Sequence, residues 1–175
     1  MVTECFKQHG AQHIRIAKDA AEADALWQGR KAAFPAVGRI SPDYYCMDGT
    51  IPRGKVGHVL TRISELSDTY GLRVANVFHA GDGNLHPLIL FDASIDGELD
   101  RAELLGGDIL TLCVDVGGTI TGEHGVGLEK MPQMPYQFGD AELAQFRRLK
   151  AAFDSEDLLN PGKGIPTLKY CQEYR

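Results

Sequence analysis

The sequence predicts an α+β fold in which an antiparallel sheet is covered by helices. Two apolar segments, residues 72–80 and 84–92, are separated only by Gly81-Asp82-Gly83, which predicts a β-hairpin. Apolar residues at helical spacing mark the segments on either side of this hairpin, at 53–70 and about 96–116. The expected order is strand, helix, strand, helix, strand, strand and helix, and this order suits such a sheet.

The first third of the chain predicts two strands and a helix. A polar helical stretch opens the sequence and leads to a strand-like run at residues 13–17. Asp19 can cap a helix over residues 20–34, which Pro35 ends. A stretch that contains glycine and proline then leads into the aromatic run 44–51, which predicts a strand.

The remaining elements are mostly helical. Pro52 suits the first turn of a helix that ends at Gly71. In this helix the apolar residues at helical spacing are Val56, Val59, Leu60, Ile63 and Leu66. In the helix at 96–116, Leu99, Leu104, Leu105, Ile109, Leu112 and Val116 are expected on or near one face. A glycine-dense loop at 117–127, a helix at about 140–153 and an extended tail follow, so we expect residues 1–175 to form one domain.

Composition narrows the classes of function. The 175 residues are 43% hydrophobic and carry a net charge of −6, which fits a folded protein and argues against nucleic acid or an anionic membrane as partner. No apolar run approaches the roughly 18 residues of a membrane span, and the first residues lack a signal-peptide pattern. The four cysteines are widely spaced, which favours free thiols in a reducing cytoplasm.

Two histidines beside the expected turn suggest a metal site. If Asp82-Gly83 forms a two-residue type I′ turn, His79 lies directly opposite His86 on one face of the hairpin. Their Cβ atoms would then be about 5 Å apart, close enough for both imidazoles to bind one cation. Pro87 lacks an N–H group, so its strand should be an edge strand or contain a bulge.

Glu123-His124, in the glycine-dense loop, can complete this site. The carboxylate would be a third ligand, and a histidine has a pKa near neutrality, which suits a general base. Two alternatives remain open: His79 and His86 as core histidines bonded to backbone groups, and Glu123-His124 as a solvated turn.

Several motifs resemble the C-terminal domain of FAD-linked oxidases, a family of 2-hydroxy-acid dehydrogenases. They are HAGDGNLHP (79–87), GGTITGEHGVGLEK (117–130) and FDSEDLLNPGKGIP (153–166). The upstream stretch LWQGRKAAFPAVGRISPDYYCMDGTIPR is similar to the glycolate oxidase branch. Together these motifs cover nearly all of residues 26–170 in the family's order. The resemblance implies a ferredoxin-like cap domain that closes the substrate site, while FAD binds mainly to an N-terminal domain that this chain lacks.

The resemblance also implies roles for individual residues. His79, His86 and Glu123 match ligands of a divalent metal such as zinc, manganese or iron, and His124 matches the base. Arg30 matches an arginine that grips the substrate carboxylate. Asn160 matches an asparagine near the flavin, while Lys163 and Arg53 are candidate contacts for substrate or flavin phosphate. Leu88 stands where the hydroxyglutarate branch has a polar residue, which favours a small acid such as glycolate or lactate.

Three functions are compatible with this pattern. The first is the substrate- and metal-binding part of a flavin-dependent 2-hydroxy-acid dehydrogenase, which is inactive without its FAD domain. Its partners would be that domain and other oxidase subunits, and the protein would lie in the cytoplasm, peripheral at the inner membrane through those subunits. The second is a metallohydrolase that uses His79, His86 and Glu123. The third is a non-catalytic interaction domain with structural histidines.

Overall fold

The computed structural model describes residues 1–166. The chain divides into two compact units, Met1–Ala36 and a second that begins at Val37. In the first unit, α1 spans Val2–Gln8 and α2 spans Ala20–Lys31, and the predicted cap is confirmed because the Asp19 carboxylate accepts from the N–H of Glu22 at 2.8 Å. The prediction of a strand at residues 13–17 is wrong, because this segment has no regular secondary structure. The short helix α3, Ala33–Val37, includes the proline that was expected to end α2.

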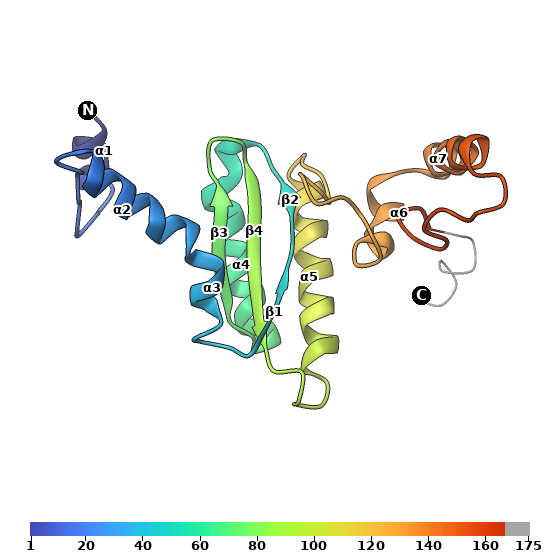
Figure 1. The fold of residues 1–175 in the computed structure, drawn as a ribbon, viewed down its shortest axis with the longest axis horizontal. Coiled ribbons are helices and arrows are strands. Elements are labelled where there is room, and N and C mark those ends of the chain that lie inside the picture. Colours follow the sequence, from blue (N-terminus) through green and yellow to red (C-terminus); the bar gives the residue numbers. More distant parts are fainter. Residues whose placement is uncertain (167–175) are drawn as a thin grey trace. The chain divides into compact units, whose positions relative to one another are not determined.

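The second unit is built on an antiparallel sheet around one central strand, β4 (Asn84–Phe91) (Figure 1). On one side β4 pairs with β3 (Val74–His79). On the other side it pairs with β1 (Asp43–Cys46) and β2 (Gly49–Thr50), which follow one another in the same register. An isolated bridge joins Thr50 to Thr119. The α+β prediction is confirmed, and the order is ferredoxin-like with its fourth strand reduced to this single bridge.

Two helices cover the sheet and form the core with it. A 3₁₀ turn at Arg53–Lys55 leads into α4, Val56–Tyr70, which ends at the left-handed Gly71 and packs against β3. The second helix, α5 (Glu98–Asp115), packs against β1, β2, β4 and α4. The face of α5 differs from the expected one, because Leu99 and Leu104 are exposed. The residues of α5 that are buried are Ala102, Leu105, Gly106, Ile109, Leu110 and Cys113.

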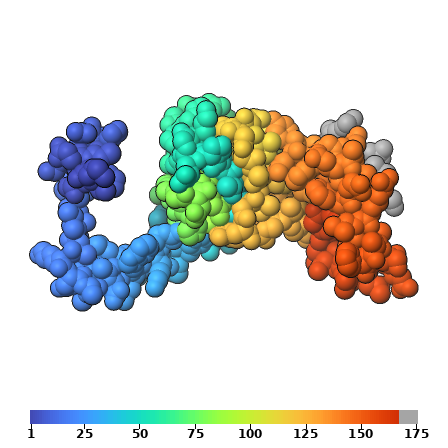
Figure 2. Space-filling view, turned by 90° about the horizontal axis from the view of Figure 1, so that it is seen from above, coloured from blue at the N-terminus to red at the C-terminus, as the bar shows by residue number. Residues whose placement is uncertain are grey.

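The remaining helices follow a loop that returns to the sheet. Figure 2 shows the segment near residue 120 packed beside the segment near residue 50, in agreement with the bridge between Thr50 and Thr119. A 3₁₀ turn at Met131–Gln133 precedes α6 (Met134–Gln137), and α7 (Asp140–Phe153) confirms the predicted last helix. Within the described residues, no helix has the length and apolar character that crossing a membrane requires.

The hairpin has a longer loop than predicted. His79 pairs with Asn84, and Val77 pairs with His86, so Ala80–Gly83 forms a four-residue connection. The N–H groups of Asp82 and Gly83 both donate to the carbonyl of His79. The register therefore differs by two residues from the predicted one. Because side chains alternate between faces with a period of two, this shift leaves His79 and His86 on the same face of the sheet.

The prediction that Pro87 marks an edge or bulged strand is wrong, since β4 is central. The N–H of Leu90 donates to Arg73 of the adjoining segment, so by alternation Pro87 and Asn76 form a non-hydrogen-bonded pair. The missing N–H of Pro87 therefore falls on the other side of β4. There Met47 donates to the Pro87 carbonyl at 3.1 Å, and the strand is interrupted between β1 and β2.

Candidate metal and base site

Three histidines gather where β3, β4 and the loop after α5 meet. The rings of His79 and His86 lie 5.4 Å apart between centroids in an edge-to-face arrangement. The ring of His124 stacks on that of His86 at 5.0 Å with an interplanar angle of 17°. His86 is only 3% exposed, whereas about half of each of the other two side chains is accessible. The cluster thus has a buried centre and an open rim.

The carboxylate of Glu123 faces all three rings. Its Oε1 atom lies 3.0 Å from Nε2 of His86, 3.6 Å from Nε2 of His124 and 4.0 Å from Nε2 of His79. The donor atoms of His86, Glu123 and His124, with one oxygen of Asp48, all lie within 4.8 Å of one another. Imidazole nitrogens and a carboxylate at this spacing are suitable ligands for a divalent cation.

A buried carboxylate holds the loop that carries Glu123 and His124. Asp48, in the break between β1 and β2, is fully buried. It accepts hydrogen bonds from three successive backbone N–H groups of the loop. These groups belong to Gly122, Glu123 and His124, at 3.1, 3.1 and 2.8 Å. The backbone around the two site residues is therefore fixed independently of their side chains.

Lys130 completes this anchor. Its ammonium is buried and lies 3.1 Å from the carboxylate of Asp48 and 3.1 Å from the hydroxyl of Thr121. Burial by itself raises the pKa of Asp48, but the N–H of His124 and the ammonium of Lys130 outweigh burial and hold that pKa well below its usual range. Asp48 is therefore ionised at neutral pH and forms a buried ion pair with Lys130.

The electrostatic environment of His86 favours metal binding. Burial lowers the pKa of His86, and the neighbouring carboxylate of Glu123 offsets this effect only in part. The imidazole is therefore neutral at pH 7 and keeps a lone pair for a cation. The buried histidine of the donor set is thus in the form that binds a divalent metal.

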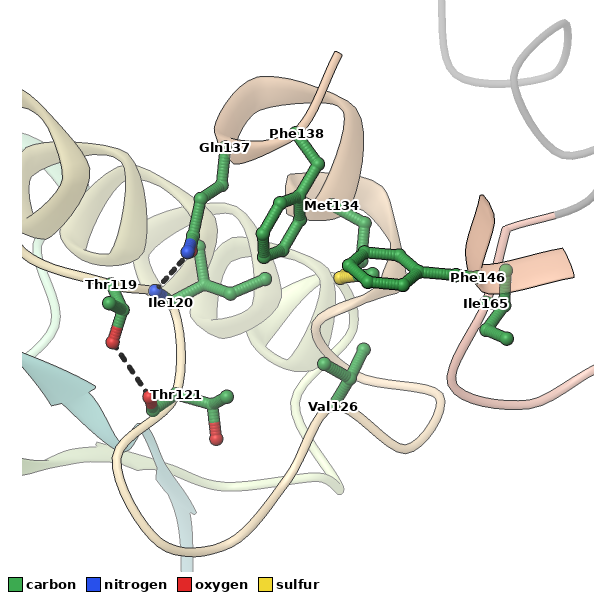
Figure 3. Close-up of a pocket in the computed structure, with 9 residues that line it drawn as sticks. All are labelled: Thr119, Ile120, Thr121, Val126, Met134, Gln137, Phe138, Phe146 and Ile165. Carbon is green, nitrogen blue, oxygen red and sulfur yellow. Dashed lines mark hydrogen bonds between the residues drawn. The ribbon is translucent and has the colours of Figure 1, made fainter. Parts of the chain in front are cut away.

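Two pockets lie near this loop. One of about 320 Å³ adjoins the cluster and is lined by Thr50, His79, Asp82, Asn84, Gly122 and Glu123. A larger pocket of about 370 Å³ lies under the base of the loop, where Val126, Phe138 and Phe146 give it an apolar wall (Figure 3). Its lining includes no charged residue or histidine, so the smaller pocket is the one suited to a polar substrate.

The other residues singled out from the sequence belong to other elements of the chain. Arg30 belongs to the last turn of α2, in the first unit. Asn160 has a φ of +47°, and its backbone carbonyl accepts a hydrogen bond from the N–H of Lys163 in a turn after α7. Lys163 helps to line a hollow with Lys150 and Asp154, and this hollow includes none of the clustered histidines. The structure therefore places His86, Glu123 and His124 in one group of donor atoms, with His79 at 4.0 Å from Glu123, but it does not bring Asn160 or Lys163 to them.

Sequence reasoning missed Asp48 and Lys130. Asp48 interrupts the aromatic run 44–51, and a charged residue in a strand was the only available signal. Its partners lie more than 70 residues away, so the sequence pattern could not reveal the anchor.

Known proteins resemble this chain over most of its length. The family described as FAD linked oxidases, C-terminal domain, matches residues 1–164. The chain is 62% identical over 173 residues to glycolate oxidase subunit GlcD of Escherichia coli strain K12, covering 99% of this chain and 35% of the relative. It is 36% identical over 157 residues to GlcD of Bacillus subtilis, covering 90% and 33%. It is 33% identical over 124 residues to a D-lactate dehydrogenase of Archaeoglobus fulgidus, covering 70% and 27%. The chain thus spans about a third of the length of the curated relatives it matches.

Proposed function

We propose that this chain, which belongs to the family of C-terminal domains of FAD-linked oxidases, forms the metal- and base-bearing part of a 2-hydroxy-acid dehydrogenase. The observation that carries the proposal is the convergence of His79, His86 and Glu123 beside His124. The names of the relatives, glycolate oxidase subunit and D-lactate dehydrogenase, support a small 2-hydroxy acid as substrate. The product would be the 2-oxo acid.

His79, His86 and Glu123 would hold the divalent cation. When bound, the cation supplies Lewis acidity that polarises the hydroxyl and carboxylate of the substrate. His124 would accept the hydroxyl proton at Nε2, the atom that faces Glu123 at 3.6 Å. Asp48 supports this role because it fixes the backbone N–H of His124, and so the position from which the imidazole reaches the substrate.

Three N–H groups of the glycine-dense loop are not available to the FAD pyrophosphate. The loop 117–127 is rich in glycine, but the N–H groups of Gly122, Glu123 and His124 already donate to Asp48. Such groups are the usual donors to a cofactor phosphate. We therefore propose that FAD binds mainly to a separate FAD-binding domain, with Asn160 and Lys163 as proposed contacts. FAD, when bound, supplies the acceptor for the substrate hydride.

The substrate-binding side of the proposal rests on two further residues. Leu88 is fully buried and lies two residues after His86 on the same face of β4. A leucine side chain offers no charged or polar partner to the second carboxylate of a diacid. This supports glycolate or lactate over a larger diacid. Arg30 is proposed to grip the carboxylate of the substrate, because a guanidinium binds a carboxylate with two parallel hydrogen bonds.

Partners and location form part of the same proposal. A relative named as a subunit supports further oxidase subunits as partners in addition to the FAD-binding domain. A cytoplasmic location, peripheral at the inner membrane through those subunits, is proposed with them.

The test is a His124→Ala substitution in this chain, assayed together with an FAD-binding domain. We expect the FAD absorbance to be retained and turnover of glycolate and D-lactate with an artificial electron acceptor to fall by roughly 10²-fold or more. His58→Ala is the matched control, because His58 is an exposed histidine on α4. Turnover by the His124 variant equal to that of the control would remove His124 from the role of base.

A further inference from the structure

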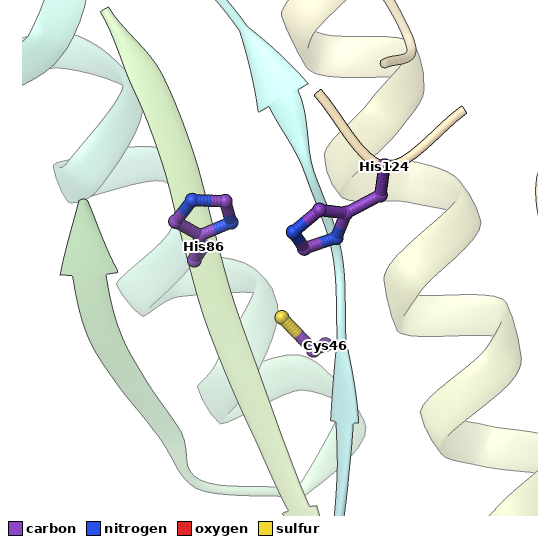
Figure 4. Close-up of side chains that lie close together, drawn as sticks. All are labelled: Cys46, His86 and His124. Atoms are coloured by element: carbon purple, nitrogen blue, oxygen red, sulfur yellow. The ribbon is translucent and has the colours of Figure 1, made fainter. Parts of the chain in front are cut away.

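A partly buried cysteine also belongs to the histidine cluster. Sγ of Cys46 and ring nitrogens of His86 and His124 all lie within 4.8 Å of one another. Figure 4 shows the sulfur directed toward both rings. The three side chains come from β1, β4 and the loop after α5, so tertiary structure alone brings them together.

This set differs chemically from the one that contains Glu123. Compared with His79, His86 and Glu123, it keeps His86, has His124 in place of His79, and has a soft sulfur in place of a hard carboxylate oxygen. Thiolate ligands select cations such as Zn²⁺ and Cd²⁺, whereas carboxylate oxygen suits Mn²⁺ and Mg²⁺. A structure that offers both sets around the shared His86 can therefore distinguish two classes of cation by their softness.

The backbone around this set is well fixed. Cys46 pairs with Leu88 across the sheet, and the next residue, Met47, donates to Pro87. The N–H of His124 is held by the buried carboxylate of Asp48 at 2.8 Å. The cation would therefore meet donors that are already positioned, and only side-chain rotation is needed to close the remaining distance.

We propose that Cys46, His86 and His124 form a second, thiophilic cation site that overlaps the first. Binding of Zn²⁺ or Cd²⁺ forms a bond from the metal to sulfur and releases the thiol proton to the buffer. The same cation occupies a lone pair of His124. If His124 is the base of the proposed reaction, this cation inhibits the enzyme, and that consequence alone rests on the proposed function.

Titration of the 175-residue chain with Cd²⁺ tests the site directly. We expect an ultraviolet thiolate-to-cadmium absorption band that saturates at one cation per chain. Cys46→Ser should weaken Cd²⁺ binding at least about tenfold, since loss of even an indirect partner of a ligand has an effect of that size. Cys113→Ser, a change to a buried cysteine outside the set, is the matched control and should leave the band unchanged. Absence of the band, or its persistence in Cys46→Ser, overturns the proposal.

A second measurement needs no variant and so does not depend on folding of Cys46→Ser. The unmodified chain is treated with N-ethylmaleimide with and without Zn²⁺, and the modified cysteines are located by mass spectrometry. We expect Zn²⁺ to protect Cys46 and to leave modification of the exposed Cys5 unchanged. Equal modification of Cys46 in both samples would contradict the site.

Glu123→Gln separates this inference from the proposed function. This substitution changes the site formed by His79, His86 and Glu123 and leaves Cys46, His86 and His124 intact. Cd²⁺ binding should therefore persist while Mn²⁺ affinity falls. A loss of Cd²⁺ binding in this variant would show that no separate sulfur site exists. A chain that binds Cd²⁺ through Cys46 but never binds Mn²⁺ would support the thiophilic site and contradict the proposed metal role of Glu123.

Discussion

Two carboxylates meet the same loop, and they differ in almost every respect. Asp48 is fully buried, is paired with Lys130 and accepts three backbone N–H groups. Glu123 is 52% exposed and faces three imidazoles. One carboxylate is saturated by the protein, while the other faces outward with room for a ligand. The comparison indicates a division of roles, in which Asp48 builds the loop and Glu123 acts from it.

This division also explains how functional side chains on a loop can have a fixed position. Loops that carry functional residues are usually held by a rigid scaffold. Here the scaffold is the sheet, and Asp48, in the break between β1 and β2, binds the backbone of the loop. The ammonium of Lys130 donates a hydrogen bond to the same carboxylate. Removal of the Asp48 carboxylate should therefore lower the stability of the fold, whereas removal of the Glu123 carboxylate should weaken cation binding and leave stability almost unchanged.

The largest expected effect is on stability. Asp48→Ala leaves the buried ammonium of Lys130 without its partner and frees three N–H groups in the loop. Breaking a buried ion pair in this way costs about 3–5 kcal/mol. Glu123→Ala removes an exposed side chain and should change the free energy of unfolding by about 0.5 kcal/mol or less. Urea denaturation of the two variants measures the contrast, and equal losses would contradict the division of roles.

A smaller loss is expected where the loop touches β2. A Cβ atom on Gly118 would lie 1.9 Å from the carbonyl oxygen of Thr50 and 2.7 Å from that of Cys113, so Gly118→Ala forces backbone to move. Overpacking of this kind costs about 1–3 kcal/mol. Gly57→Ala is the control, because Gly57 lies inside α4 with open space around it. It should raise stability by about 0.5–1 kcal/mol, and thermal unfolding of both variants tests the pair.

Of the fold, the hairpin and the helices around it followed from periodicity, but the burial of α5 did not. Leu99 and Leu104 were expected on the buried face, yet that face of α5 combines Leu105, Ile109 and Leu110 with the small residues Ala102, Gly106 and Cys113. At Gly106 a Cβ atom would lie 3.0 Å from sulfur of Met47 and 3.1 Å from the ring of Tyr45, so these large side chains occupy space next to the helix. Hydrophobicity alone ranks leucine above glycine and cannot anticipate such close packing.

Of the site, the face of the sheet was predictable and the loop length was not. Alternation placed His79 and His86 on one face whether the loop has two or four residues. The longer loop depends on a distant contact, because the N–H of Ile51 donates to the carbonyl of Gly83 at 2.9 Å. A Cβ atom on Gly83 would lie 2.1 Å from the Ile51 carbonyl oxygen, so glycine is required there for a reason that local turn rules do not contain.

The difference between the carboxylates should also appear as a pH dependence. The folded-state pKa of Asp48 is held below its ordinary value near 3.8, so the unfolded chain takes up a proton at a higher pH than the folded chain. The stabilisation is therefore complete above about pH 5 and is lost as the pH falls below about 4. Asp48→Asn removes this titration. Its unfolding free energy should fall less steeply than that of the wild type between pH 5 and pH 3 in urea denaturation, and parallel curves would contradict the prediction.

The smallest expected effect concerns the thiols beneath the site. Burial raises the pKa of Cys46 to about 11 and that of Cys113 to about 12, so both remain protonated at pH 8. The carboxylate of Asp48 adds to the shift at Cys46. Iodoacetamide should therefore modify the exposed Cys5 first, Cys46 slowly and Cys113 last. Mass spectrometry over time gives the order, and Cys113 reacting before Cys46 would contradict the burial of the core.

The central claim is that His79, His86 and Glu123 bind one divalent cation from a loop that Asp48 holds in place. Titration calorimetry of the chain with Mn²⁺ tests it most directly, with Glu123→Gln and the exposed neighbour Glu129→Gln as a matched pair. We expect one cation per chain, affinity reduced on the order of 10–100-fold in Glu123→Gln and no change in Glu129→Gln. Equal affinity in the two variants, or no binding by the unmodified chain, would contradict the account.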